Sequence, residues 1–202
     1  MTRIHIGALF FPGFEMLDIY GPLELFSMHR EAYGITPVGL DAGPVPASGG
    51  PATLAEAGIA ATTIYDMVIV PGGAGAREAR KNDALLDWLV AQAAGGALMA
   101  SVCTGSVLLG RAGLLDGRRA TTNKLAFDWV AQQCPQVHWQ RRARWVWDGN
   151  MVTSSGVSAG MDMALAIIER QQGAQAAKDA ALWAEYLPNA DPDNDPFERS
   201  ET

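Results

Sequence analysis

The sequence has few cysteines and no long hydrophobic run. Its 202 residues include two cysteines, too few for a disulfide framework, and a reducing, cytoplasmic setting is therefore expected. No apolar stretch approaches the roughly 18 residues of a membrane-spanning helix, so we expect no membrane partner. Acidic residues outnumber basic ones by 22 to 15, which gives a net charge of −7. That balance argues against nucleic acid as a partner, because phosphate groups are bound by basic surfaces.

Histidine is also scarce, and the positions of the three histidines exclude some chemistry. His5 lies in a predicted strand, His29 lies late in a predicted helix, and His138 precedes a tryptophan. Thr104 follows Cys103, whereas a cysteine protease or amidotransferase needs a histidine base. A fold that brings His138 back to Cys103 is the open exception. The histidines, cysteines and carboxylates lack metal-ligand spacing, so we predict no metal site and no cofactor.

Buried strands alternate with helical segments along most of the chain. This order predicts an α/β fold with a mostly parallel central sheet and helices on both faces. Residues 35–41 and 45–54 are predicted to form a hairpin or an edge excursion around Gly43 and Pro44. The other predicted strands are residues 3–11, 66–70, 98–102, 137–147 and 151–154, and the predicted helices are residues 16–30, 83–94, 104–109, 125–133, 160–172 and 174–186.

Composition divides the chain into one domain and a tail. Residues 1–187 are expected to form a single α/β domain. Residues 188–202 are acidic, rich in proline and aspartate and without periodicity. We expect this tail to be extended or disordered, or to drape over a neighbour.

Cys103 ends a short apolar run, and small residues then open a helical pattern. The segment predicts a strand, a sharp turn with the thiol, and a helix. A thiol at a helix start lies near the positive end of the helix dipole, which favours the nucleophilic thiolate. Covalent catalysis by Cys103 is therefore the leading hypothesis, against a buried cysteine that packs as a small hydrophobe. Cys134, before Pro135, lacks these features and is interpreted as structural.

Two further segments follow predicted strands and are expected at the same edge of the sheet, where α/β proteins bind ligands. Asp18 lies near a helix start, where it either caps the helix or moves a proton for Cys103. Glu15 is the competing carboxylate and is expected to be solvated. Gly72 and Gly73 either form an ordinary turn or present free backbone N–H groups that stabilise negative charge.

One basic cluster stands out against the acidic composition. Arg141, Arg142 and Arg144 lie beside Trp139 and Trp145. Arginines and tryptophans together can stack on nucleic acid bases, but alternation in a surface strand is the favoured interpretation.

Several stretches together resemble the ThiJ/PfpI superfamily, a glutamine-amidotransferase-like group. The resemblance covers about residues 4–186 and implies a flavodoxin-like three-layer sandwich with a cysteine nucleophile elbow. The residues that carry it are Phe11-Pro12-Gly13, Leu17-Asp18-Ile19-Tyr20-Gly21-Pro22, Ile69-Val70-Pro71-Gly72-Gly73, Ser101-Val102-Cys103-Thr104-Gly105-Ser106, Ala120-Thr121-Thr122 and Gly156-Val157-Ser158-Ala159-Gly160-Met161-Asp162.

Within the superfamily, the motifs resemble the isonitrile hydratases and the amidase-like domain of AraC-type regulators. The resemblance implies a hydro-lyase that forms a thioimidate on Cys103, with Asp18 as acid and base. Thr104, Gly73 and Asn123 would then hold the substrate or its developing charge. Asn123 and Lys124 stand where the hydratase pattern has histidine and tryptophan, which predicts a different substrate preference. A small-molecule substrate and a homodimer are expected.

Two other functions remain open at this point. An accessible cysteine of low pKa oxidises readily, so the chain could act as a non-catalytic redox or small-molecule sensor. An amidase or a glyoxalase-like enzyme that acts on small carbonyl compounds is the third possibility.

Overall fold

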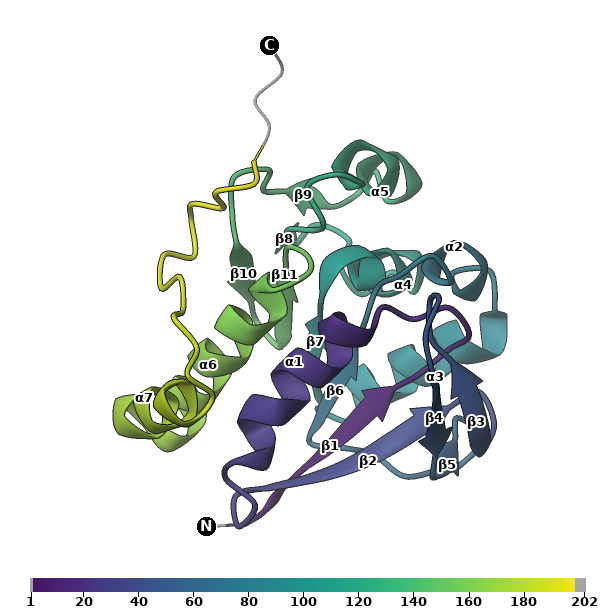
Figure 1. The fold of residues 1–202 in the computed structure, drawn as a ribbon. Coiled ribbons are helices and arrows are strands. Elements are labelled where there is room, and N and C mark those ends of the chain that lie inside the picture. The colour runs from purple at the N-terminus through teal and green to yellow at the C-terminus, as the bar shows by residue number, and fades with distance from the viewer. Residues whose placement is uncertain (1, 199–202) are drawn as a thin grey trace.

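A seven-stranded sheet forms the centre of the molecule (Figure 1). The structure is a computed structural model and describes residues 2–198, so Met1 and the end of the predicted tail, residues 199–202, lie outside the described residues. The strand order is β10-β11-β7-β6-β1-β2-β5, and every pairing is parallel except that of β10 with β11. The strands are β1 (Ile4–Leu9), β2 (Tyr33–Gly39), β5 (Ala57–Gly58), β6 (Met67–Val70), β7 (Leu98–Ser101), β10 (Trp145–Asp148) and β11 (Met151–Ser154).

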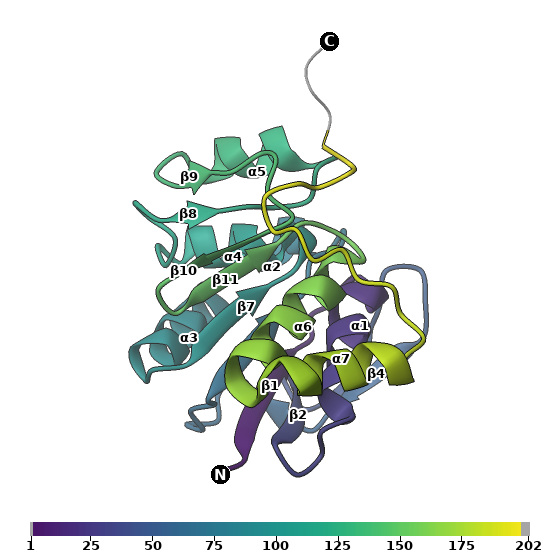
Figure 2. The same ribbon diagram turned by 90° about the vertical axis from the view of Figure 1, so that its left-hand side faces the viewer.

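Helices cover both faces of this sheet, as the alternating pattern predicts (Figures 1 and 2). One layer contains α1 (Met16–Ser27), α6 (Ala159–Gln172) and α7 (Ala174–Trp183), which pack on one another. The other side carries α2 (Ala76–Ala79), α3 (Asp83–Ala94), the short 3-10 helix η1 (Cys103–Gly105), α4 (Ser106–Arg111) and α5 (Phe127–Gln133). The mostly parallel α/β sandwich is therefore confirmed.

The central strands place the predicted site segments side by side. All four residues of β6 are buried, as expected for a β-branched strand covered on both faces. Val70 pairs with Ser101 at the ends of β6 and β7. The loop with Gly72 and the turn with Cys103 therefore leave the same edge of the sheet next to each other.

The predicted hairpin lies elsewhere in the chain. β2, which contains most of residues 35–41, is a strand of the main sheet and runs parallel to β1. The hairpin consists of β3 (Gly43–Pro46) and β4 (Ala52–Ala55), with its turn at residues 47–51. Gly49, Gly50 and Pro51 supply the turn residues, whereas Gly43 and Pro44 lie within strand β3.

The predicted strand over residues 137–147 is interrupted. β9 (His138–Trp139) pairs with β8 (Arg119–Ala120) outside the main sheet, and β10 begins only at Trp145. The backbone N–H of Arg144 donates to the Pro192 carbonyl at 2.7 Å, so the tail replaces a strand partner here. The surface-strand interpretation is wrong for Arg144, whose side chain is buried and pairs with Asp162 at 2.6 Å.

The described part of the tail packs on its own chain. After α7 it passes over α6 and reaches the β9–β10 region, where the yellow segment of Figure 2 lies. The Asn189 N–H donates to Asp162 Oδ1 at 3.0 Å, and the Asp195 N–H donates to the Arg142 carbonyl at 2.8 Å. Asp195 is itself buried, with its Oδ2 3.5 Å from Arg144 Nη1. Arg144 thus joins the tail to α6 through two buried carboxylates.

Replacing Arg144 should destabilise the protein strongly. Arg144→Met leaves the buried carboxylates of Asp162 and Asp195 without their shared cation, and breaking a buried ion pair from one side costs about 3 kcal/mol or more. Urea denaturation should show that loss of unfolding free energy. Arg142→Met is the matched control, because Arg142 is exposed and should change stability by about 0.5 kcal/mol at most. Equal stabilities of the two variants would contradict the role of Arg144.

Candidate active site

Cys103 occupies a sharp turn between β7 and α4. Its φ is 57°, a left-handed conformation that non-glycine residues rarely adopt and that occurs at functional sites. The surroundings fix this backbone. The Cys103 N–H donates to the Ser155 carbonyl at 3.1 Å, and the Cys103 carbonyl accepts from Thr122 Oγ1 at 3.0 Å. The predicted strand-turn-helix with a thiol at the turn is what the structure contains.

Asp18 is the third residue of α1, and its carboxyl points to the elbow. Glu15 is the N-cap residue of α1, and its side chain makes no capping hydrogen bond. The Asp18 carboxyl is completely buried, and its Oδ2 accepts the Gly72 N–H at 2.9 Å. It interacts with the Cys103 thiol, while Oδ1 has no conventional hydrogen-bond partner among residues 2–198. The helix-cap interpretation of Asp18 is therefore wrong.

Gly72 is the point at which α1 and the elbow converge. A Cβ atom on Gly72 would lie 2.5 Å from both the backbone nitrogen and Oγ1 of Thr104, and 3.0 Å from Asp18 Oδ2. Only glycine therefore allows these groups to approach each other. The glycine pair after a buried strand is the local pattern that indicates this position.

The Gly73 N–H is engaged and does not lie free. It donates to Thr104 Oγ1 at 3.1 Å, while the Gly72 N–H is taken by Asp18. The expectation that both glycines present free N–H groups therefore fails in this structure. Gly73 instead fixes the hydroxyl of Thr104 beside Cys103.

Asn123 completes the polar surroundings of the sulfur. Its Oδ1 accepts the Ala126 N–H at 3.0 Å, and its side chain hydrogen bonds with the Cys103 thiol. Gly156 faces both groups, and a Cβ there would lie 2.7 Å from Cys103 Sγ. Gly156 was not predicted as a site residue, although it begins one of the motifs that carry the family resemblance.

Burial controls the ionisation of this pair. Desolvation raises the pKa of Asp18 to about 7, although hydrogen bonds from Gly72 and Cys103 oppose the shift and the charge of Glu15 adds to it. Desolvation and the negative charge of Asp18 also raise the pKa of the Cys103 thiol, and the Thr104 N–H and Asn123 compensate only in part. The expected preference for thiolate is therefore reversed. The resting cysteine is a thiol next to a carboxyl that titrates near neutral pH.

Lys124 is buried next to Asn123. Its Nζ donates to Thr121 Oγ1 at 2.8 Å and to the Ala143 carbonyl at 2.6 Å. Burial lowers the pKa of Lys124 to about 8, while the charges of Asp195 and Glu198 raise it. The ammonium is thus held by protein oxygens and by tail carboxylates.

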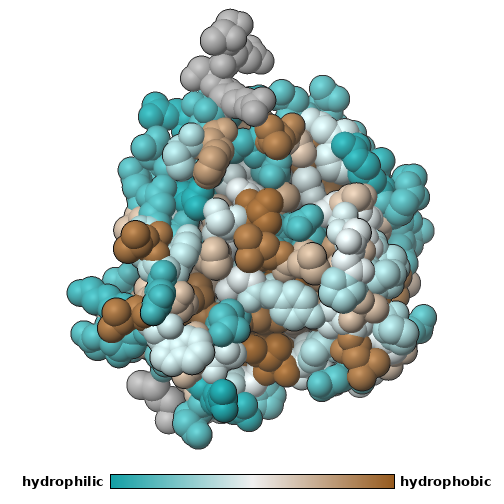
Figure 3. All heavy atoms as spheres, in the orientation of Figure 1, coloured by the Kyte–Doolittle hydropathy of each residue, from teal (hydrophilic) through white to brown (hydrophobic). Residues whose placement is uncertain are grey.

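A hollow of about 520 Å³ adjoins the elbow. Asn123 and Gly156, which surround the sulfur, belong to its lining, together with Lys124 and the tail residue Phe197. Figure 3 shows hydrophobic residues gathered on this face where the N-terminal ends of α1 and α6 meet. Small apolar molecules are the ligands that suit such a hollow.

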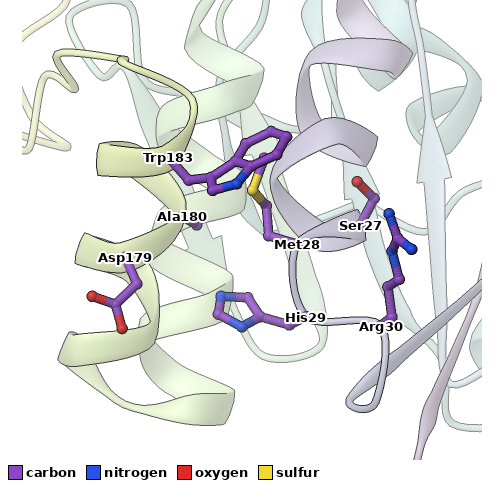
Figure 4. Close-up of a pocket in the computed structure, with 7 residues that line it drawn as sticks. All are labelled: Ser27, Met28, His29, Arg30, Asp179, Ala180 and Trp183. Carbon is purple, nitrogen blue, oxygen red and sulfur yellow. The ribbon is translucent and has the colours of Figure 1, made fainter.

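A second hollow lies at the opposite end of α1 from Asp18 (Figure 4). It is lined by residues that follow or end α1, such as Met28 and His29, and by Trp183 of α7. His29 Nε2 is engaged with the Ala176 carbonyl at 3.0 Å. Cys103 and the first hollow are therefore separate from this second hollow.

The remaining candidates do not add to the site. Cys134 is buried with its sulfur 3.9 Å from the Val107 carbonyl, in keeping with a structural role. His138 is exposed and is not among the groups that act on the thiol. Among residues 2–198, no three histidine, cysteine or carboxylate side chains are grouped so that they could hold a metal ion. No helix within the same residues is long and apolar enough to span a bilayer.

The fold and the elbow define an α/β protein with a cysteine in a strand-helix turn at the carboxyl edge of a parallel sheet. The sequence pattern of the DJ-1/PfpI family matches residues 5–170, and the chain belongs to that family. A ThiJ/PfpI family protein from Pseudomonas syringae has a similar structure, with a TM-score of 0.85 and 30% identity, covering 98% of this chain and 78% of that one.

Two curated relatives show how this domain is used elsewhere. Isonitrile hydratase of Pseudomonas putida is 34% identical over 185 residues, which are 92% of this chain and 79% of the relative. The HTH-type transcriptional regulator GbdR of Pseudomonas aeruginosa is 34% identical over 173 residues. That alignment covers 83% of this chain but 47% of the regulator. The family therefore includes both an enzyme and regulators.

The raised pKa of Asp18 predicts a pH-dependent cost in stability. Folded Asp18 keeps its proton up to pH 7, whereas the unfolded chain loses it near pH 4, so the unfolding free energy should fall between these values. Asp18→Asn removes the titration and should be more stable than the wild type by roughly 2 to 4 kcal/mol at about pH 8, with little difference near pH 4.

Urea denaturation across this pH range measures the difference. Glu15→Gln is the control, because it removes a neighbouring charge and leaves Asp18 in place, so most of the pH dependence should persist. A stability difference between Asp18→Asn and the wild type that does not vary with pH would contradict the buried titration of Asp18.

Proposed function

We propose that this protein hydrates an isonitrile to an N-substituted formamide, with Cys103 as nucleophile and Asp18 as acid and base. The pairing of a buried thiol with a carboxyl of pKa about 7 is the observation that supports this chemistry. The similarity to isonitrile hydratase over most of the chain supports the choice of substrate class. The terminal carbon of an isonitrile both accepts a nucleophile and takes up a proton. A thiol and a carboxyl side by side can supply these two functions.

In the first half-reaction, the ionised Asp18 takes the proton of the Cys103 thiol. The thiolate attacks the terminal isonitrile carbon and forms the C–S bond. Asp18 then gives its proton to that same carbon, and the product is a thioimidate, R–N=CH–S–Cys103. Because burial raises the pKa of the thiol above that of Asp18, the first transfer is uphill and proceeds as the C–S bond forms, whereas the pKa of Asp18 near 7 lets it hold the proton and return it to carbon.

In the second half-reaction, the carboxylate of Asp18 takes a proton from water. The hydroxide attacks the thioimidate carbon, and the C–S bond breaks. One proton ends on the nitrogen of the formamide and one on the sulfur of Cys103, which restores the thiol. The reaction adds one water molecule overall and uses neither a metal nor an oxidant.

Thr104 and Asn123 are the residues that we propose act on the substrate. The Thr104 hydroxyl is fixed by the Gly73 N–H and adjoins Gly72, where Asp18 also lies. The amide of Asn123 hydrogen bonds with the thiol, with its oxygen held by Ala126. We assign Thr104 to the isonitrile nitrogen as charge develops and Asn123 to the sulfur.

Purified protein incubated with cyclohexyl isonitrile should therefore produce the formamide, detected by chromatography. Cys103→Ala should abolish turnover because the C–S bond cannot form, and Asp18→Asn should lower kcat by about 100-fold or more because the proton carrier is lost. Cys134→Ala is the matched control and should retain wild-type turnover. Turnover that survives Cys103→Ala would contradict the mechanism.

A sensor function is the second candidate, supported by the similarity to GbdR. A sensor predicts tight binding of a small molecule without formamide production. Loss of methylglyoxal without isonitrile turnover would instead indicate a glyoxalase-like enzyme. The buried thiol with its raised pKa weighs against a cysteine that oxidises readily.

The pH profile should report Asp18. The reaction needs its carboxylate to accept the thiol proton, so kcat/KM should rise with pH through about 7 and then level off. Initial rates between about pH 5 and 9 measure this. An Asp18→Glu variant that keeps partial activity should show a displaced midpoint, and a profile that stays flat across pH 7 would exclude Asp18 as the base.

A further inference from the structure

The hollow next to Cys103 has one wall that comes from the tail. Pro196, Phe197 and Glu198 line it together with Asn123 and Gly156, which adjoin the sulfur. We name residues 195–198 the tail wall. Leu17, which precedes Asp18, and Leu125 belong to the same lining. The hollow is therefore formed by segments far apart in the sequence.

Buried charges clamp the tail wall in place. Asp195 is 2% exposed and faces Arg144, whose Nη1 lies 3.5 Å away, and it also interacts with the charge of Lys124. The wall is shaped from this anchor, because the Phe197 N–H donates to Asp195 Oδ1 at 2.8 Å and the Glu198 N–H donates to the Asp195 carbonyl at 3.0 Å. Asp195 thus fixes the backbone that presents Phe197.

The buried charged side chains around the tail wall also determine the net charge near the hollow. Arg144 and Lys124 contribute two buried positive charges, and Asp162 and Asp195 contribute two negative ones. Lys124 also donates two hydrogen bonds to protein oxygens. These cations are neutralised within the protein, so the hollow does not select an anion.

Exposed hydrophobic side chains surround this neutral hollow. Leu17, Leu125 and Phe197 are 43%, 76% and 63% exposed, so these large apolar side chains are available to a ligand. Phe197 offers an aromatic ring on which a planar substituent can stack. All three side chains belong to the lining of the hollow.

We propose that the tail wall, with Phe197 at its centre, selects isonitriles whose nitrogen carries a bulky, uncharged aromatic group. This inference rests on the proposed function. The substituent packs between Phe197 and the leucines of the lining while the isonitrile carbon reaches Cys103. Lys124 then acts as a positioning residue whose positive charge stabilises Asp195 and through it the wall.

Phe197→Ala tests the wall. The ratio of kcat/KM for benzyl isonitrile over methyl isonitrile should fall about fivefold, through a higher KM for the benzyl substrate, because an aromatic contact is lost. Leu182→Ala is the matched control, since Leu182 is 78% exposed but lies on α7. Asp195→Ala should move the ratio in the same direction as Phe197→Ala, with circular dichroism to confirm folding. An unchanged ratio in Phe197→Ala would overturn the proposal.

A second measurement separates the wall from the isonitrile chemistry. In a Cys134→Ala background, alkylation of Cys103 by iodoacetamide and by 2-iodo-N-phenylacetamide is followed by intact mass at alkaline pH. The wall predicts a preference for the phenyl reagent that Phe197→Ala reduces about fivefold and Leu182→Ala leaves intact. If isonitriles are not turned over but this preference is found, the proposed function is wrong, whereas the proposed selection of aromatic groups by the tail wall is supported. Equal preferences in all variants, or no labelling of Cys103, would overturn the wall itself.

Discussion

The buried carboxyl of Asp18 is the group on which the site depends. It joins two βα units of the fold, because α1 supplies the carboxyl and the loop after β6 supplies the Gly72 N–H that holds it. Burial of Asp18 raises the pKa of its carboxyl to about 7. Burial of Cys103 and the negative charge of Asp18 together raise the pKa of the neighbouring thiol, which stays protonated. The carboxyl of Asp18 and the thiol of Cys103 therefore form one interacting pair, and no histidine is among the groups that shift their pKa values.

A second set of buried charges serves architecture. Arg144, Asp162 and Asp195 tie the tail to α6 and to the segment before β10, and Lys124 adds its charge next to the site. Removing charges from water is expensive, so such groups are stable only as a balanced set. Their balance leaves the hollow neutral although two cations lie near it. The tail thereby becomes part of the site region and not an appendage.

Local patterns predicted much of this fold. The parallel strands, the elbow at Cys103 and the carboxylate candidate Asp18 all follow from short apolar runs and the residues that end them. The predictions failed where a distant segment decides the structure. Arg144 resembles a surface arginine in a strand until Pro192 and Asp195 of the tail are placed against it. The hairpin was misplaced because two glycine- and proline-rich turns competed, and packing selected the second.

The sequence by itself determined the α/β order, the thiol at a strand end and the absence of a histidine after it, since these depend on periodicity and adjacency. Only the tertiary structure decided that Asp18 faces Cys103, that Gly73 holds Thr104 and that the cysteine rests as a thiol. The physical reason is that ionisation depends on burial and on charges brought together from different elements. A helix dipole can be inferred from a local pattern, whereas the desolvation that outweighs it arises only when the chain has folded.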